Sequence, residues 1–205
     1  MHSKTVPTIS DQRAEKKQIS RRVFFTAAAA TAAGFGGWLY GKKRDAEDDA
    51  LLAGPLEIVR IVEFSESGAR TGAVEVPKVR KSQREWREQL SPVAYSVTRE
   101  EDTEMAFSGQ YWDWHEAGLF RCICCATALF SSRAKFDSGT GWPSFWEPAA
   151  KENIVEKTDA SFGMIRTAVS CRRCDAHLGH VFDDGPPPTG LRYCMNSVSL
   201  RFAKG

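Results

Sequence analysis

The sequence predicts a mainly β protein with a short helical lead-in. From residue 98 onward, short apolar segments rich in β-branched and aromatic residues alternate with Gly, Pro, Ser and Asp, a pattern typical of many short strands. Two helix start signals precede these segments, and two Cys-x-x-Cys pairs lie among them. The chain has 205 residues, of which 42% are hydrophobic and 26% charged, so it is long enough to bury a core and has an ordinary globular composition.

The first 44 residues predict an export signal or anchor. Paired Arg21 and Arg22 precede the uncharged and mildly apolar run 24–40, which is short for a membrane-spanning helix. This arrangement resembles a twin-arginine signal, which implies export to a bacterial periplasm. The alternative is a buried, Ala-rich helix in a cytosolic domain. No clean cleavage site follows the run, so the segment is either removed or retained as an inner-membrane anchor, the only membrane contact that we expect.

Residues 45–80 predict a tether followed by a small β extension. The stretch 45–55 is first acidic and then small and apolar, as a tether would be. Residues 56–64 are rich in β-branched side chains and predict a strand, 65–68 supply turn residues, and 72–76 predict a returning strand. Together they indicate a hairpin.

Residues 81–205 predict the main domain, and its two helices come first. Ser82 can cap a helix that runs to Leu90, with Glu85 placed to complete a capping box. Ser91 followed by Pro92 predicts the start of a second short helix. Strands are then expected at 120–122, 128–130, 164–169 and 198–202. Residues 81–205 carry 15 Lys and Arg against 16 Asp and Glu, which argues against a nucleic-acid-binding surface.

The two Cys-x-x-Cys pairs predict a structural zinc site. Cys122 and Cys125 form one pair, Cys171 and Cys174 the other, and four thiolates are the ligand set of a closed tetrahedral zinc site. Two matched pairs are a far more specific signal than one. The alternatives are disulfides in an exported protein and a redox-active pair. Cys124 lies inside the first pair and is left over.

A sixth cysteine is the candidate nucleophile. Cys194 lies between Arg192 and Asn196, and if this run is a strand, the three side chains share one face. His177 and His180 could be metal ligands, general acids or core residues; a separate thiol favours the acid role, because a nearby histidine makes a thiolate useful. The run 136–145 indicates a rigid loop that displays aromatic side chains, although core packing explains it equally well.

Together these motifs resemble the methionine sulfoxide reductase B family. The resemblance runs from about residue 82 to residue 202. It is carried by the run 136–145 and by Cys171-Arg-Arg-Cys174, His177-Leu-Gly-His180-Val-Phe, Asp184-Gly-Pro and Arg192-Tyr-Cys194-Met-Asn196-Ser. The family reduces the R epimer of methionine sulfoxide, usually within proteins, and has a β-rich fold of two antiparallel sheets. We therefore expect two antiparallel sheets with short N-terminal helices, pinned by one zinc ion.

The resemblance also implies a role for each candidate residue. Cys194 would attack the sulfoxide sulfur and become a sulfenic acid, while the charge of Arg192 would favour its thiolate. His180, with His177 nearby, would polarise or protonate the sulfoxide oxygen, and Asn196 would hydrogen-bond in the same pocket. Trp142 and Phe145 would bind the substrate, and the ring of Trp142 would face its S-methyl group. The implied zinc ligands are Cys122, Cys125, Cys171 and Cys174.

One position departs from the family pattern. Many relatives have a resolving cysteine just before Gly-Trp-Pro-Ser-Phe, where this chain has Thr140. Cys124 is a poor substitute because it lies within a metal-binding pair. We therefore expect a thioredoxin-like protein or another external thiol to reduce the sulfenic acid, and we expect a monomer. The rival hypotheses are a non-catalytic zinc module of the same fold that binds another protein, and a thiol oxidoreductase that uses the Cys-x-x-Cys pairs.

Overall fold

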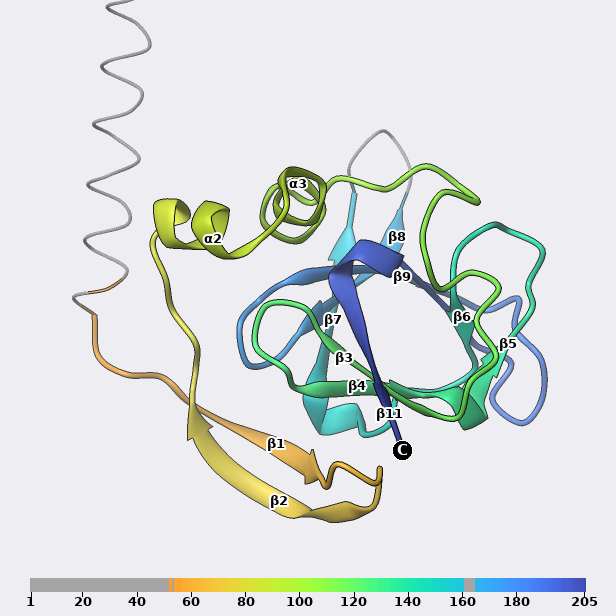
Figure 1. Cartoon of the computed structure of the whole chain (residues 1–205), viewed down its shortest axis with the longest axis horizontal. Helices are drawn as coiled ribbons and strands as arrows, with labels where there is room; N and C mark the ends of the chain where they lie inside the picture. The colour runs from red at the N-terminus through yellow and green to blue at the C-terminus, as the bar shows by residue number, and fades with distance from the viewer. Residues whose placement is uncertain (1–51, 53, 161–164) are drawn as a thin grey trace, which may run out of the picture. The chain divides into compact units, whose positions relative to one another are not determined.

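Short strands dominate the structure, and the predicted mainly β fold with two short helices is confirmed (Figure 1). The computed structural model describes residues 52, 54–160 and 165–205, so the predicted export segment 1–44 lies outside the described residues. In the described part of the chain, no helix is long and apolar enough to span a membrane. The elements, in chain order, are β1 (Ile58–Phe64), β2 (Arg70–Pro77), α2 (Gln83–Gln89), α3 (Pro92–Glu100), β3 (Gly118–Cys122), β4 (Ala128–Ser131), η1 (Ser132–Ala134), β5 (Lys135–Phe136), β6 (Ser144–Phe145), η2 (Lys151–Asn153), β7 (Ile154–Asp159), β8 (Arg166–Cys171), β9 (His177–Phe182), β10 (Arg192–Met195), η4 (Ser197–Ser199) and β11 (Leu200–Lys204).

The strands of the main domain form two antiparallel sheets. One has six strands in the order β5-β6-β10-β9-β8-β7, and the other has three in the order β11-β3-β4. The N-terminal hairpin β1–β2 forms a separate two-stranded sheet. In the large sheet β10 lies between β6 and β9, so its residues are flanked by side chains from both neighbours.

Both helices begin where the sequence predicts. Ser82 caps α2, accepting a hydrogen bond from the Glu85 backbone N–H, while the Glu85 side chain accepts one from the Ser82 N–H, a complete capping box. Ser91 caps α3, and Pro92 occupies its first turn. Helix α3 packs against β9 and η4, and Trp86 of α2 is fully buried.

A cluster of aromatic rings forms the core between the sheets. Phe120, Phe130 and Phe145 are all 0% exposed, and the rings of Phe130 and Phe145 stack with their centroids 4.5 Å apart. Tyr193 lies on β10, next to Cys194, and its ring centroid is 5.8 Å from that of Phe130. Alternation along β10 therefore directs Tyr193 and Met195 into the core and leaves Arg192 and Cys194 on the opposite face.

The predicted N-terminal hairpin is confirmed, and one buried side chain attaches β1 to the main domain. Asn153 is 0% exposed; its Oδ1 accepts a hydrogen bond from the Val62 N–H at 2.7 Å. Its Nδ2 donates to the carbonyl oxygens of Val62 at 2.8 Å and Ala128 at 2.7 Å. The Asn153 amide thus hydrogen-bonds with backbone groups of both β1 and β4.

The four strands predicted in the main domain correspond to β3, β4, β8 and β11, but the prediction was incomplete. The strand expected at 198–202 begins only at Leu200, because Ser197–Ser199 form a 3₁₀ turn with Asn196 at its N-cap position. The strand expected at 164–169 is β8, which begins at Arg166 and ends at Cys171. The prediction did not include β5, β6, β7 or β9.

Candidate functional site

The thiol of Cys194 lies in the middle of the six-stranded sheet. Cys194 is directly opposite His180 on β9 and Ser144 on β6, so these three side chains share one face of the sheet. The Thr140 Oγ1 is 4.0 Å from the Cys194 Sγ. The cysteine is partly buried and is a free thiol.

Two features of the surroundings shift the pKa of Cys194 in opposite directions. Burial raises the pKa of the thiol, while the positive charge of Arg192 acts in the opposite direction. The Arg192 guanidinium forms a two-point ion pair with Asp184, with Nε–Oδ1 and Nη2–Oδ2 distances of 2.8 Å. It also stacks over the Phe182 ring at 4.5 Å. These contacts fix the cation beside the sulfur.

The two histidines on β9 have different environments. The His180 Nε2 lies 2.9 Å from Asp159 Oδ2, and the same oxygen accepts a hydrogen bond from Arg166 Nη2 at 2.8 Å. His177 is 4% exposed, and its Nε2 has no hydrogen-bond partner among the described residues. Burial, followed by the charge of His180, lowers the pKa of His177 to about 4, so its imidazole is neutral at pH 7.

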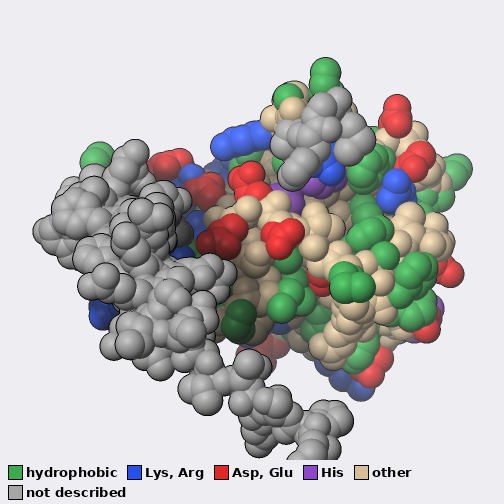
Figure 2. Space-filling view, turned by 90° about the horizontal axis from the view of Figure 1, so that it is seen from above, with side chains coloured by type: hydrophobic (Ala, Val, Ile, Leu, Met, Phe, Trp, Pro, Cys, Tyr) green, Lys and Arg blue, Asp and Glu red, His purple; other side chains and the backbone are tan. Residues whose placement is uncertain are grey.

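Both histidines line a polar cleft of about 460 Å³. Asp159 and Arg166 line it with them, and Glu101 and Asp102 contribute acidic side chains from the end of α3 and the residue that follows. The space-filling view shows histidine side chains at the surface next to acidic and basic ones (Figure 2). Trp142 and Cys194 are not among the residues that line this cleft.

Trp142 and Asn196 are joined through a buried glutamate. Trp142 is partly exposed, and its Nε1–H donates to the Glu104 carbonyl oxygen at 3.1 Å. The Glu104 N–H donates to Asn196 Oδ1 at 3.0 Å, and Asn196 Nδ2 donates to the Leu178 carbonyl oxygen at 3.1 Å. Asn196 lies just beyond β10 and is 3% exposed, so its side chain holds the backbone of β9 and of residue 104.

Phe145 was predicted to contact substrate, but the structure places it in the core. Its side chain is 0% exposed and stacks on Phe130, because it lies opposite Tyr193 and its strand directs alternate side chains to opposite faces. The preceding residue, Ser144, faces Cys194 instead. Phe145 therefore packs in the core beneath the strand that carries Ser144 and is not exposed at the site.

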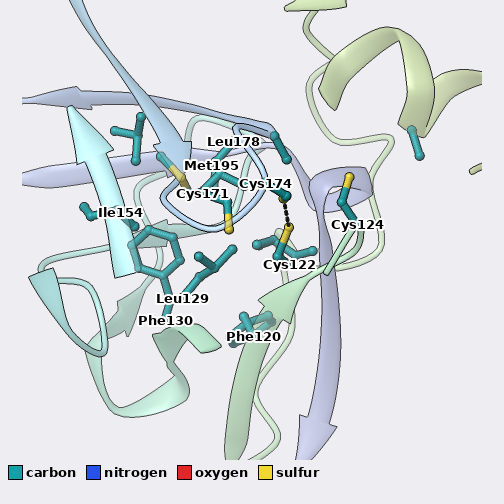
Figure 3. Close-up of a cluster of buried hydrophobic side chains, with 14 of the residues drawn as sticks. Phe120, Cys122, Cys124, Leu129, Phe130, Ile154, Cys171, Cys174, Leu178 and Met195 are labelled. Atoms are coloured by element: carbon teal, nitrogen blue, oxygen red, sulfur yellow. Dashed lines mark hydrogen bonds between the residues drawn. The ribbon is translucent and has the colours of Figure 1, made fainter. Parts of the chain in front are cut away.

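The four cysteines of the two pairs converge in a tight group. The Sγ atoms of Cys122, Cys125, Cys171 and Cys174 all lie within 4.8 Å of one another. Cys122 Sγ is 3.6 Å from Cys174 Sγ (Figure 3). Cys125 Sγ is 3.5 Å from Cys171 Sγ. A tetrahedral site with Zn–S bonds of about 2.3 Å needs sulfur–sulfur edges of about 3.8 Å. The geometry and the donor set therefore fit a metal ion held by four thiolates.

The backbone forms the same turn at both pairs. In the first, the Ala126 N–H donates to the Cys122 carbonyl oxygen at 2.9 Å, and Ala126 has a left-handed φ of 66°. In the second, Asp175 donates to the Cys171 carbonyl oxygen at 2.9 Å and has a φ of 55°. Non-glycine residues adopt this conformation at a cost of about 1–2 kcal/mol, so both turns have the same unfavourable conformation at the residue after the second cysteine.

Cys124 lies beside this group but is not one of its four members. Cys124 is 6% exposed, and its Sγ lies 3.6 Å from Thr98 Oγ1 on α3. Its carbonyl oxygen accepts a hydrogen bond from Gln89 Nε2 at 2.8 Å. Figure 3 shows its sulfur pointing away from the Cys122–Cys174 contact.

Comparison with known proteins assigns this arrangement to a family. A family model described as the SelR domain matches residues 90–204, more than half of the chain. The chain belongs to the MsrB family. The peptide methionine sulfoxide reductase MsrB of Herminiimonas arsenicoxydans is 61% identical over 125 residues, which are 61% of this chain and 91% of that protein. The protein of the same name from Hahella chejuensis is 59% identical over 125 residues, or 61% of this chain and 90% of the relative.

The match to the MsrB family confirms the resemblance that the motifs predicted. Sequence reasoning nevertheless missed three acidic residues that hold the site: Glu104, Asp159 and Asp184. Asp184 could have been suspected, since it lies in the quoted Asp-Gly-Pro motif. Glu104 and Asp159 have no local signal, because their partners lie 93 and 21 residues away.

Proposed function

We propose that this chain reduces the R epimer of methionine sulfoxide to methionine, in proteins or as the free amino acid, and so repairs oxidised proteins. The observation that carries the proposal is the register of β9, β10 and β6, in which His180 and Cys194 are paired across the strands. A sulfur nucleophile and a proton-bearing group on one face are the two parts that the reaction needs. The relatives named peptide methionine sulfoxide reductase support the same activity.

The proposed reaction transfers one oxygen atom. The Cys194 thiolate attacks the sulfoxide sulfur, the oxygen takes up a proton, and the products are methionine and a Cys194 sulfenic acid. Two external thiols then convert the sulfenic acid to the free thiol, forming one disulfide and one water molecule. Arg192 stabilises the thiolate that starts the reaction, because its charge opposes the effect of burial on the pKa of Cys194.

The histidines supply the proton or polarise the oxygen. His180 is held by Asp159, and this contact supports its role as the proton-bearing group. His177 offers a neutral imidazole whose Nε2 is buried and unpartnered within the described residues, so it can hydrogen-bond a substrate oxygen without losing another contact. Trp142, with its indole fixed by Glu104, is proposed to pack on the S-methyl group of the substrate, a contact worth about 0.3–1.5 kcal/mol.

We assign the four-cysteine group to zinc in a structural role. Four thiolates, three of them buried and that of Cys125 partly buried, leave no open position, which is the pattern of a structural site and not of a catalytic one. Zinc bound there would join the β3–β4 turn to the β8–β9 turn.

We further propose that an external thiol, such as a thioredoxin-like protein, recycles Cys194, since Thr140 occupies the place of a resolving cysteine and Cys124 lies next to the metal group. The paired arginines and the run 24–40 support export to the periplasm, with retention or removal of the segment both compatible. We expect the enzyme to act as a monomer.

The decisive experiment is turnover of R- and S-sulfoxide peptides with dithiothreitol as the reductant. We expect turnover of the R epimer alone, and its complete loss in Cys194→Ser. Cys124→Ser is the matched control, because it removes the other cysteine outside the metal group and should retain turnover. No turnover of either epimer would favour a non-catalytic zinc module, and turnover that survives Cys194→Ser would favour chemistry at the Cys-x-x-Cys pairs.

A further inference from the structure

Three hydroxyl groups form a continuous chain that ends at the proposed nucleophile. Ser144 Oγ lies 2.7 Å from Ser138 Oγ, and Ser138 Oγ lies 2.8 Å from Thr140 Oγ1. Thr140 Oγ1 is in turn 4.0 Å from Cys194 Sγ, at the long end of hydrogen bonds to sulfur. Ser144 is fully buried, so its hydroxyl depends on these protein partners.

The direction of the donors in this chain depends on the state of the thiol. Each hydroxyl can donate only one hydrogen. When Cys194 is a neutral thiol, it can donate to Thr140, and the donors then run through Ser138 and Ser144 to the Trp142 carbonyl oxygen, which lies 3.4 Å from Ser144 Oγ. When Cys194 is a thiolate, the donors can all reverse, so that Thr140 donates to the sulfur.

The reversal favours the charged state. It gives up the Ser144 contact to the Trp142 carbonyl, which at 3.4 Å is long for an O–H···O bond with a usual length of about 2.7–2.8 Å. It gains a hydrogen bond to an anion, which is roughly twice as strong as one between neutral groups. The two short inner contacts are kept in both directions.

We propose that Ser144, Ser138 and Thr140 act as a reversible hydroxyl chain that donates a hydrogen bond to the Cys194 thiolate. Thr140 contacts the reacting sulfur and is the terminal donor, while Ser138 is a positioning residue that orients the Thr140 hydroxyl. The proposal rests on Cys194 being the reacting thiol. Thr140, at the place of a second cysteine in many relatives, thus supplies a hydrogen-bond donor where those proteins have a thiol.

The charged groups that face Cys194 are known, so the contribution of the chain can be isolated. Arg192, paired with Asp184, acts from the same strand, and His180 faces the sulfur from β9. From β6 the facing residue is Ser144, which carries no charge. A substitution at Thr140 leaves all of these charges in place.

The test is the pH dependence of Cys194 alkylation by iodoacetamide in the zinc-loaded full chain, followed by mass spectrometry of the Cys194 peptide. Thr140→Val removes the hydroxyl at nearly constant shape and should raise the apparent pKa of Cys194 by about one unit, a tenfold slower alkylation below that pKa, or about 1.4 kcal/mol. Thr140→Ser should restore the wild-type profile, and Ser138→Ala should produce a smaller shift in the same direction.

Superimposable profiles for Thr140→Val and the wild type would overturn the proposal, as would a Thr140→Ser profile that matches Thr140→Val. Alkylation requires neither sulfoxide nor reductant, so this result is independent of the proposed activity. If Thr140→Val shows the alkylation shift but the wild-type chain does not turn over sulfoxide, the function is refuted and the hydroxyl chain still stands.

Discussion

Replacing Glu104 by Gln tests how much the buried Glu104 carboxylate contributes to stability. The backbone of the same residue contacts both Trp142 and Asn196. The Glu104 side chain is part of a residue only 5% exposed, and its two oxygens accept hydrogen bonds from the backbone N–H groups of Ser197 at 2.7 Å and Val198 at 3.0 Å. These donors belong to the first turn of η4, which follows directly after β10. Glu104→Gln keeps the shape but retains only one acceptor oxygen.

The expected cost follows from those two bonds. A hydrogen bond to a charged group contributes about 1.5–3 kcal/mol, and Gln converts one of the two into an N–H group facing another N–H. We therefore expect Glu104→Gln to lower the free energy of unfolding by about 2–4 kcal/mol. Since the Glu104 backbone also contacts Trp142 and Asn196, we expect a lower kcat/KM for the sulfoxide peptide, with the larger change in KM.

Urea unfolding of the zinc-loaded protein, followed by tryptophan fluorescence, measures the first effect, and steady-state turnover measures the second. Glu75→Gln is the matched control, because Glu75 is exposed on β2 and the same substitution should there change stability by less than about 0.5 kcal/mol. An unfolding free energy for Glu104→Gln within 0.5 kcal/mol of the wild type would refute the reasoning, since a buried carboxylate with two such bonds cannot be replaced at that cost.

Three further predictions concern the scaffold and its response to conditions. Asn153→Ala should destabilise the fold by about 2–5 kcal/mol, because it leaves the buried Val62 and Ala128 groups unpaired; faster hydrogen exchange at Val62 would report the release of β1, and unchanged exchange would contradict it. The pKa of His177 is about 4 when folded and about 6.5 when unfolded, so the unfolded state binds the extra proton and stability falls as the pH drops from 6.5 towards 4. Unfolding free energies between pH 4.5 and 7 should show this slope, at most about 1.4 kcal/mol per pH unit, and His177→Asn should flatten it; equal slopes would contradict it. Metal analysis of the purified protein should give about one zinc per chain, and removal by a chelator should lower the Tm; less than half an equivalent would exclude the assignment.

The parts of the fold that the sequence predicted are those whose signals are local. The caps of α2 and α3 depend on Ser82, Ser91 and residues within one turn of them, and the β1–β2 hairpin depends on one turn. The four-cysteine group could also be predicted, because each Cys-x-x-Cys pair is a local pattern whose two copies need only to meet.

Strand β9 was missed because its pattern is not that of an exposed strand. His177, Leu178 and Gly179 are all buried in succession, so the run shows no alternation of apolar and polar residues. Gly179 also has a φ of 154° and lies against the Cys194 carbonyl oxygen, where a Cβ would approach that atom to 2.1 Å. In the sequence, a glycine at this position suggests a turn. In the structure, its lack of a Cβ allows β9 and β10 to approach each other closely.

The sequence alone could not show which aromatic residue of the loop faces the core, because strand pairing determines the face on which each side chain lies. Trp142 and Phe145 are three residues apart, and nothing local states which one faces the core. The pairing of Ser144 with Cys194 sets the register, and with it Phe145 is buried.

The proposed metal centre and the proposed reaction site are connected through β9. Cys174 lies three residues before His177, and the Cys171–Cys174 turn leads directly into the strand that carries both histidines. The helices brace both turns: Gln89 of α2 donates to the Cys124 carbonyl oxygen, and Arg99 of α3 donates to the Cys174 carbonyl oxygen, each at 2.8 Å. Cys194, by contrast, is held between β6 and β9 by backbone pairing well away from either turn in sequence. A structural metal placed there fixes the start of β9 and hence the histidines more directly than it fixes the thiol. Partial loss of the metal should therefore reduce sulfoxide turnover before it changes the alkylation rate of Cys194, and the reverse order would show that the metal acts on the sulfur itself.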